Sequence, residues 1–433
     1  MPLPSSDYII RKVAARGILD SRGNPTVQVD LHTVGGFGRF SVPSGASKGR
    51  FEASEVRDGN KAKFHGLGVS KAVRNVAMVL GPGVVGMNSK DQRKVDNKLV
   101  KLDGTKNKSR LGANAILGVS MATARAKAAT EGVPFYRGVQ DGRRLLLPLP
   151  MMNILNGGKH AGNELSFQEF MILPAGFDRF SEALRCGSEI YHVLGHALSR
   201  KYGKSAVNVG DEGGFAPPIQ SVRDALEVVN GAVEEAGYSP GREVSLGIDP
   251  AADSFYDPTT KVYRVDGRSL NTEELFDYYL DLVETFPLRS LEDPFQDGDF
   301  AGFAELTERI GSKAQVVGDD LFVTNSARVE RGVRLGAANA LLVKVNQAGT
   351  LTEAVEAMEA ARSARYGLVM SHRSGETEDT SIADLAVGLA TGQIKAGAPA
   401  RGERTAKYNR LLEVEEELGS KAEFYGPRFL TAS

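Results

Sequence analysis

Six ionisable residues follow one another along the second half of the chain, each at the point where an apolar, strand-like run ends. In order, they are Asp249, Glu292, Asp319, Lys344, His372 and Lys395. Their numbers differ by 43, 27, 25, 28 and 23. A strand, a loop and a helix together take roughly 30 residues, and a closed (β/α)8 barrel carries its chemistry at the carboxyl ends of its strands. These carboxylates, lysines and histidine, brought to one rim, would make a metal-assisted acid–base site.

The three acids of this series, Asp249, Glu292 and Asp319, offer only oxygen ligands. Hard oxygen ligands select Mg²⁺ or a similar cation, which keeps some water or substrate oxygens in its octahedral shell. Each acid taken singly could instead cap the helix that follows its strand. Their occurrence at consecutive strand ends favours a metal site.

Lys344 ends the apolar run ANALLVK, and two interpretations of it stay open. A buried lysine is costly unless it is paired or neutral, and a general base must be neutral. In the first interpretation, burial and a nearby cation lower its pKa from about 10.4 far enough for it to act as a base. In the second, Lys344 forms a structural ion pair with Glu292 or Asp319. Spacing alone does not separate the two.

Two further segments place acids or a histidine beside Gly-rich turns. NVGDEGGF contains Asp211 and Glu212, and on a strand only one of two adjacent side chains would enter the barrel. LNGGKHAGNELSFQEFMILP contains His160 and then a strand that bears Glu169. A histidine in a Gly-rich loop is usually only a loop residue, but the acid on the following strand favours a functional role.

Two more segments could contact an anionic substrate or cover it. SHRSGETED places His372, Arg373 and Ser374 in a row, a set of donors suited to a phosphate or a carboxylate. VPSGASKG is a Gly/Ser loop at residues 42–49. Such a loop is often merely flexible, yet it can also form a lid.

The first third of the chain reads as strands followed by helices, which is typical of an α+β domain. The alternating runs TVQVDLHT and FGRFSVP predict two strands, joined by a Gly-Gly turn. Helices are then expected at residues 69–80, 91–102 and 111–129.

From residue 151 onward, apolar strands alternate with amphipathic helices such as 223–236 and 272–286. Asn271 and Glu274 could form a capping pair at the start of the second helix. The segment QDGRRLLLPLP interrupts both patterns. We therefore predict an N-terminal α+β capping domain over residues 1–142 and an α/β barrel domain over residues 143–433.

The composition gives no reason to expect nucleic acid or an anionic membrane as a partner, because the net charge is −1. The single cysteine, Cys186, excludes an intrachain disulfide and suits a reducing cytoplasm. The first residues lack the continuous apolar core of a signal peptide, and no apolar run approaches membrane-spanning length.

These segments together make the chain resemble the enolase family over residues 15–424. The resemblance is carried by SRGNPTV, VPSGAS, LNGGKHAGN, QEFMILP, NVGDEGGFAP, EDPF, GDDL, LLVKVNQAGT, SHRSGETEDT, GQIKAGAPAR and EEELG. It implies a small α+β domain followed by a TIM-type (β/α)8 barrel of the variant order ββαα(βα)6. It also implies the interconversion of 2-phospho-D-glycerate with phosphoenolpyruvate and water, in glycolysis and gluconeogenesis.

The resemblance further implies two Mg²⁺ ions per active site, the second entering with substrate. The tight site would fall on Asp249, Glu292 and Asp319, and Ser47 in the mobile loop would help to hold the second ion. Lys344 would remove the proton from C2, and Glu212 would be the acid for the leaving hydroxyl. Glu169 and His372 would complete the catalytic set. The residues implied to contact substrate are His160, Glu169, Glu292, Asp319, His372, Arg373, Ser374 and Lys395.

The partners implied by the resemblance are the small-molecule substrate and further copies of the same chain, in a homodimer or a higher oligomer built from dimers. Neither nucleic acid nor a membrane span is expected. The expected location is the cytoplasm, with room for a cell-surface or secreted fraction that lacks a signal peptide. The sequence departs from the family at Lys48, Lys159 and Gly402, among other positions, without replacing an implied catalytic group.

Two other functions stay open beside this one. The chain could be a relative that acts on an unphosphorylated sugar acid, although the SHRSGETED segment favours a phosphorylated substrate. It could also be a related fold recruited as a structural or surface-binding protein. The intact set of acids and Lys344 argues against a purely non-catalytic role.

Overall fold

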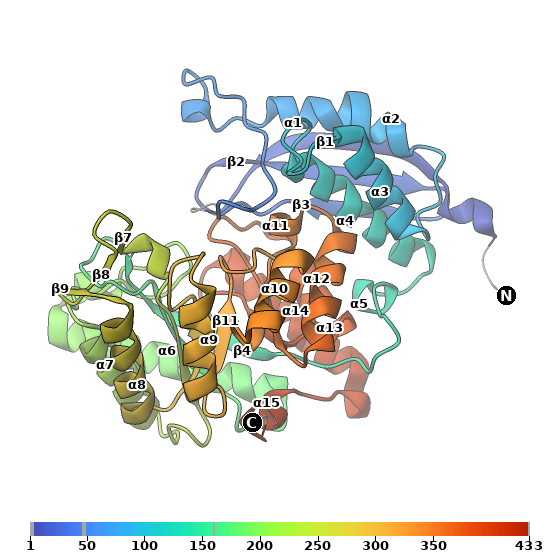
Figure 1. The fold of residues 1–433 in the computed structure, drawn as a ribbon. Coiled ribbons are helices and arrows are strands. Elements are labelled where there is room, and N and C mark those ends of the chain that lie inside the picture. Colours follow the sequence, from blue (N-terminus) through green and yellow to red (C-terminus); the bar gives the residue numbers. More distant parts are fainter. Residues whose placement is uncertain (1–3, 46–48, 159–160, 432–433) are drawn as a thin grey trace.

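The computed structural model describes residues 4–45, 49–158 and 161–431. Figure 1 shows the N-terminal strands, in blue, beside a barrel whose helices run from green to red. The fold class expected from the sequence is confirmed, because a small sheet-and-helix part precedes a closed barrel.

The N-terminal part is an antiparallel sheet backed by helices. Its strands lie in the order β1 (Ile10–Leu19), β2 (Pro25–Thr33) and β3 (Phe37–Ser41). The alanine-rich helix α4 (Ala113–Thr130) packs on this sheet and is buried along most of its length. Gly38 allows that approach, because a Cβ there would lie 2.1 Å from the carbonyl oxygen of Ala122.

Shorter helices complete the N-terminal part. The predicted helix at 69–80 is observed, but it continues through a π-helical turn to Val84, next to Pro82, which has no N–H to donate. The N-terminal helices besides α4 are η1 (Ser5–Tyr8), η2 (Phe64–Gly66), α1 (Ser70–Asn75), η3 (Val76–Leu80), α2 (Gly81–Val84), α3 (Gln92–Asp103) and α5 (Phe135–Gly138).

Eight strands of the described chain close the barrel, in the spatial order β10-β11-β12-β13-β14-β4-β5-β6. Their bounds are β4 (Leu149–Asn156), β5 (Glu169–Leu173), β6 (Ser245–Asp249), β10 (Leu288–Glu292), β11 (Gln315–Gly318), β12 (Ala340–Val343), β13 (Gly367–Ser371) and β14 (Gly392–Lys395). Most of these residues are buried on both faces, as apolar strands wrapped by helices should be.

The helices that follow these strands confirm the order ββαα(βα)6. Two helices, α6 (Phe180–Tyr202) and α7 (Val222–Glu235), come after β4 and β5. The principal helices after the remaining strands are α8 (Thr272–Thr285), α9 (Phe300–Ile310), α10 (Ser326–Leu335), α12 (Leu351–Ser363), α13 (Ser381–Gly388) and α14 (Gly402–Leu418). The shorter elements are η5 (Lys204–Val207), η6 (Ala252–Ser254), α11 (Val345–Ala348), η7 (Gly419–Lys421) and α15 (Gly426–Thr431).

Strand β5 runs antiparallel to both of its neighbours, β4 and β6. Its first residue therefore lies at the rim where the other strands end. Glu169 begins β5 and pairs in register with Asp249, the last residue of β6. This reversal brings an acid from the start of a strand to the same rim as acids from strand ends.

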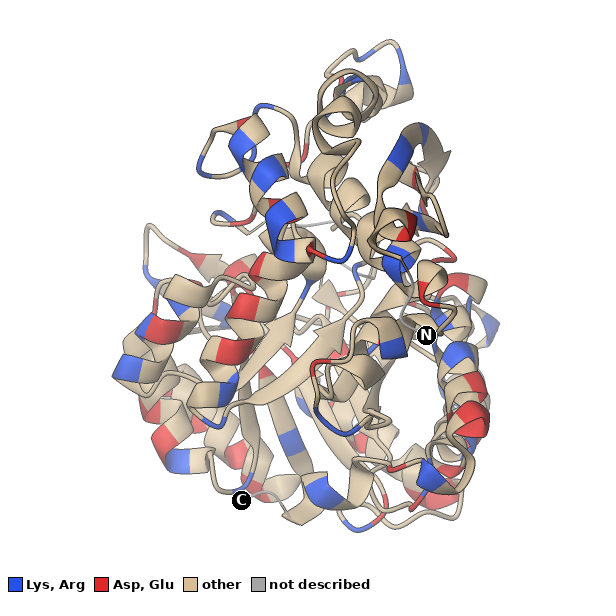
Figure 2. Cartoon of the chain, turned by 90° about the vertical axis from the view of Figure 1, so that its right-hand side faces the viewer, with Lys and Arg blue, Asp and Glu red and all other residues tan. Residues whose placement is uncertain are grey.

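A side sheet of β7 (Tyr256–Asp257), β8 (Val262–Val265) and β9 (Arg268–Leu270) follows β6. The predicted capping pair is confirmed, since Asn271 and Glu274 bond each other's backbone at the start of α8. Figure 2 shows both signs of charge interspersed on the outer helices. Among the described residues, none of the helices has the length and apolar character needed to cross a membrane.

Candidate active site

The six residues predicted from spacing all lie at the carboxyl-terminal rim of the barrel. Asp249, Glu292 and Lys395 are the last residues of β6, β10 and β14. The others directly follow β11, β12 and β13, and they are Asp319, Lys344 and His372. The segment spacing therefore predicted their placement correctly.

These side chains converge on a small cavity of about 40 Å³ at the rim. The predicted site residues that line it are Glu169, Glu212, Asp249, Asp319, Lys344, His372, Arg373, Ser374 and Lys395. Glu292 lies behind this lining and contacts Lys395. Two predicted residues, Ser47 and His160, lie outside the described residues.

Lys395 is the cation at the centre of three buried carboxylates. Its Nζ lies 3.0 Å from Glu169, 3.0 Å from Asp249 and 2.9 Å from Glu292. Burial raises the pKa of Glu292, and the charge of Asp249 adds to that effect. Burial and the charge of Glu212 likewise raise the pKa of Glu169. The carboxylates crowd so closely that they require positive charge nearby.

The donor set at this rim fits a hard divalent cation. Glu292 is fully buried, and among the described residues its Oε1 has no hydrogen-bond partner. A buried carboxylate oxygen without a partner is costly unless a cation or another donor satisfies it. The acids of the predicted set, Asp249, Glu292 and Asp319, supply oxygen only, as Mg²⁺ prefers.

A second grouping of acids overlaps the predicted one. Oxygens of Asp293, Asp319 and Asp320 all lie within 4.8 Å of one another. However, the two oxygens of Asp293 accept the backbone N–H groups of Asp319 and Asp320, at 2.9 and 2.7 Å. We interpret Asp293 as the residue that orients this turn, with Asp319 common to both groupings. Burial and the charge of Asp319 raise the pKa of Asp320 to about 7.

Lys344 pairs with the carboxylate of Asp319, which also accepts a hydrogen bond from Gln347 at 2.9 Å. Burial acts to lower the pKa of Lys344, but the charges of Asp319 and Glu292 outweigh it and raise the pKa. The ion-pair interpretation therefore describes Lys344 in this structure. The pKa of Lys344 is raised where a base would need it lowered, because the charge of Asp319 is directed at the ammonium group.

Glu212 enters the rim from a turn, not from a strand. The premise that Asp211 and Glu212 lie on a strand is wrong, because residues 211–213 form a turn with Gly213 at φ +89°. Glu212 is nevertheless the buried member of the pair. Gly214 permits the close approach to β4, since a Cβ there would lie 2.4 Å from Asn156 Oδ1.

The segment after β13 presents His372, Arg373 and Ser374 to the cavity. Both terminal nitrogens of Arg373 lie 3.1 Å from the carboxylate of Glu52, and one of them donates to Asn346 at 3.0 Å. Glu52 thus accepts hydrogen bonds from one edge of the guanidinium group, and this group would be expected to bind a phosphate. An anionic substrate would compete with this carboxylate for that edge.

Several residues of the site were missed by reasoning from the sequence. Arg404 and Lys407 are fully buried on α14 and reach the segment 372–377. A signal was available, because Arg404 shares the helical spacing of Tyr408 and Leu411, which face the core. Glu52 gave no such signal, since its contact with Arg373 joins residues 321 positions apart.

Comparison with known proteins assigns both parts of the chain. Residues 10–139 match the enolase N-terminal domain family, and residues 144–433 match the enolase C-terminal TIM barrel domain family. The chain is 56% identical to a protein named Enolase from Methanopyrus kandleri, over 97% of this chain and 98% of that protein. It is 54% identical to proteins named Enolase from Thermococcus gammatolerans and Pyrococcus furiosus, in each case over 98% of both chains.

Proposed function

The chain belongs to the enolase family and is a hydro-lyase, a phosphopyruvate hydratase (EC 4.2.1.11), and we propose that its rim residues divide the reaction as follows. The substrate is 2-phospho-D-glycerate, and the products are phosphoenolpyruvate and water, in glycolysis and gluconeogenesis. Lys344 takes the C2 proton on Nζ, and the C2–H electron pair is first delocalised onto the substrate carboxylate. The C3–O bond then breaks, and the electron pair forms the C2=C3 bond. Glu212 gives its proton to the departing hydroxyl, which leaves as water.

The observation that carries this proposal is the placement of Lys344 and Glu212 around the barrel. Lys344 follows β12, and Glu212 contacts Asn153 of β4, so β13 and β14 lie between them. Both side chains line the same cavity. A base and an acid on different sides of one substrate suit an elimination in which the proton and the hydroxyl leave from opposite faces.

The carboxylates of Asp249, Glu292 and Asp319 would hold Mg²⁺, and a second Mg²⁺ would enter with substrate beside Ser47. The chemistry that Mg²⁺ would supply when bound is positive charge, which would offset the charge of Asp319 that keeps Lys344 protonated, so that Lys344 could be neutral, and would offset the negative charge that develops on the substrate. Lys395 adds its ammonium charge at the same place, 2.9 Å from Glu292.

The remaining predicted residues would bind and orient the substrate. Arg373 and Ser374 would bind the phosphate, which would compete with Glu52 for the guanidinium group of Arg373. His160 and Glu169 would contact the reacting end, and Glu169 would act beside Glu212. His372 would contact substrate from the end of β13. Arg373 supports a phosphorylated substrate, because its planar donor pair matches phosphate oxygens.

We also propose a homodimer, or a larger assembly built from dimers, located in the cytoplasm. Leu19 and Phe64 support an interface on the N-terminal part, since both are more than half exposed beside an apolar cavity of about 530 Å³. We place the domain boundary between residues 142 and 143, in the gap between the two family matches.

The test is a direct assay with purified protein, 2-phospho-D-glycerate and Mg²⁺, followed by the ultraviolet absorbance of the enol phosphate. The proposal predicts turnover with Mg²⁺ that stops in excess EDTA and resumes when Mg²⁺ is restored. Absence of turnover, together with dehydration of an unphosphorylated sugar acid, would contradict it.

A further inference from the structure

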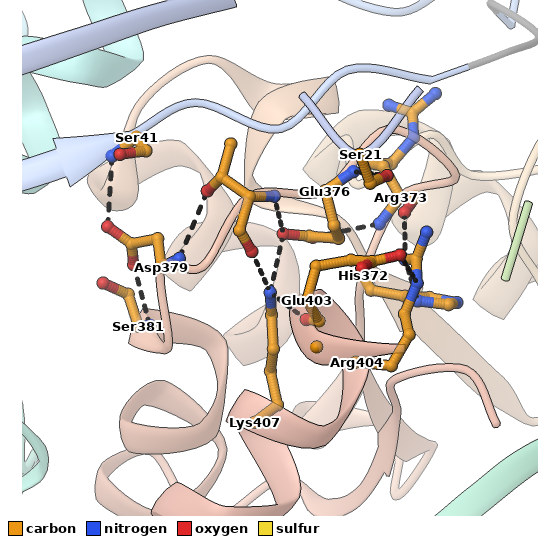
Figure 3. Close-up of polar contacts among 12 residues, drawn as sticks. Ser21, Ser41, His372, Arg373, Glu376, Asp379, Ser381, Glu403, Arg404 and Lys407 are labelled. Atoms are coloured by element: carbon orange, nitrogen blue, oxygen red, sulfur yellow. Dashed lines mark hydrogen bonds and ion pairs between the residues drawn. The ribbon is translucent and has the colours of Figure 1, made fainter. Parts of the chain in front are cut away.

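Arg404 forms a hydrogen bond with one ring nitrogen of His372. Arg404 is fully buried in the first turn of α14, and its Nη1 lies 2.7 Å from His372 Nδ1 (Figure 3). A guanidinium group can only donate hydrogen bonds, so His372 Nδ1 must accept. A neutral imidazole that accepts at Nδ1 carries its proton at Nε2.

The charged form of His372 is disfavoured at this position. An imidazolium ring would direct an Nδ1–H group at an N–H group of Arg404, two donors facing each other. Burial lowers the pKa of His372 to about 4, and Arg404 acts in the same direction against the opposing charge of Glu212. The ring is therefore neutral near pH 7.

The other ring nitrogen faces the proposed acid. His372 Nε2 lies 3.3 Å from Glu212 Oε2, and Asn153 Nδ2 donates to the same oxygen at 3.1 Å. The His372 contact is long and imperfectly aligned, and contacts of this kind tighten when a substrate binds. Because Oε2 faces two N–H donors, the proton of a protonated Glu212 belongs on Oε1.

Accepting the proposed role of Glu212 as the acid, we propose that Arg404 is a positioning residue. It fixes His372 as the neutral Nε2–H tautomer, and that N–H together with Asn153 binds Glu212 Oε2, so that Oε1 delivers the proton to the leaving hydroxyl. As Glu212 gives up its proton, negative charge grows on the carboxylate, and a donor already in place stabilises it.

The rest of the Arg404 environment keeps this arrangement rigid. Its Nη1 also donates to the carbonyl of Arg373 at 2.6 Å. Its Nη2 donates to the carbonyls of Ser374 at 2.6 Å and Asp211 at 3.0 Å. Arg404 thus links the backbone on both sides of the His372–Glu212 contact. A purely structural anchor would make the same carbonyl bonds, so the test must read the tautomer itself.

The first test is nitrogen NMR of protein labelled with ¹⁵N in the histidine rings, with the His372 signal assigned by its loss in His372→Gln. We expect the Nε2–H pattern in the wild type and in Arg404→Lys, which keeps a donor. We expect Arg404→Met to lose that fixed pattern. Lys407→Met is the matched control, because it also removes a buried cation of α14 that contacts the segment after His372. Lys407 Nζ donates to Glu376 at 3.0 Å (Figure 3). The control should leave the His372 tautomer unchanged.

The second test separates the two halves of the reaction. With substrate in D₂O, Arg404→Met should still exchange the C2 proton, while release of water slows roughly 10²-fold, the loss typical of one missing donor to a developing charge. His372→Gln should retain more water release than His372→Asn, because the glutamine amide reaches the Nε2 position.

Several results would overturn the proposal. An Nδ1–H or doubly protonated His372 in the wild type would do so, even if Arg404→Met did not fold. So would an unchanged tautomer in folded Arg404→Met, or an equal loss of both half-reactions. Failure of the enzyme to act on 2-phospho-D-glycerate would contradict the proposed function and leave the NMR result to decide the tautomer separately.

Discussion

Replacing Lys395 with methionine should destabilise the protein far more in EDTA than in Mg²⁺. Lys395 lies 2.9–3.0 Å from three carboxylates, and its side chain is 3% exposed. Removing one partner of a buried ion pair typically costs about 3–5 kcal/mol, because the remaining charge stays buried. At about 2 °C per kcal/mol for a domain of this size, the expected fall in melting temperature without metal is roughly 6–10 °C.

Bound Mg²⁺ would supply the missing positive charge if Asp249 and Glu292 are its ligands. The stabilisation that Mg²⁺ adds should therefore be larger in the variant than in the wild type, by about 2 kcal/mol or more beyond the mass-action effect that both share. The assay is thermal unfolding of both proteins at pH 8, in EDTA and in saturating Mg²⁺.

Lys407→Met is the matched control for this experiment as well. Lys407 is also fully buried and also pairs with a buried acid, Glu376 at 3.0 Å, but it lies outside the proposed metal set. Its loss should lower the melting temperature equally in EDTA and in Mg²⁺. If the two variants respond to Mg²⁺ alike, the assignment of the metal to the Lys395 carboxylates is refuted.

Two further variants test the electrostatics of the same rim. Burial lowers the pKa of His372 to about 4 in the folded protein, below its value of 6.5 in the unfolded chain. As pH falls, the unfolded chain therefore takes up a proton at His372 first, and the wild type loses stability between pH 6.5 and pH 4. Between pH 7 and pH 4.5 this effect amounts to roughly 2.5 kcal/mol, which His372→Gln should largely remove from the loss of stability measured by urea unfolding. Equal losses in both proteins would contradict this. Glu52→Gln should bind inorganic phosphate about tenfold more tightly by calorimetry, because no carboxylate then competes for Arg373, a gain of about 1.4 kcal/mol. Unchanged phosphate affinity would show that Glu52 does not compete.

The rim could be predicted from the sequence because it depends on a local rule. Asp249, Glu292 and Lys395 each end an apolar run, and a parallel barrel brings such ends together wherever the intervening helices lie. Glu169 was found through its strand, although its place at the rim depends on the reversed direction of β5.

The contacts that control charge at the rim could not be read from the sequence. Whether Lys344 pairs with Asp319 or stands as a base depends on which cation Asp319 faces, and spacing is the same in both cases. The strand expected at Asp211 and Glu212 is not formed, and a Gly-rich turn brings Glu212 inward instead. Arg404 contacts His372 across more than 30 residues of chain, and Glu52 contacts Arg373 from the N-terminal domain. No periodic pattern in the sequence marks either partner.

Exchange of the C2 proton of 2-phospho-D-glycerate with deuterium, followed by proton NMR in D₂O with Mg²⁺, tests the central claim most directly. The account predicts rapid exchange in the wild type, continued exchange in Glu212→Gln without release of water, and a loss of at least about 10³-fold in Lys344→Ala, the upper part of the range for a general base. Exchange in folded Lys344→Ala at the wild-type rate would contradict the account, because another group would then be removing the proton.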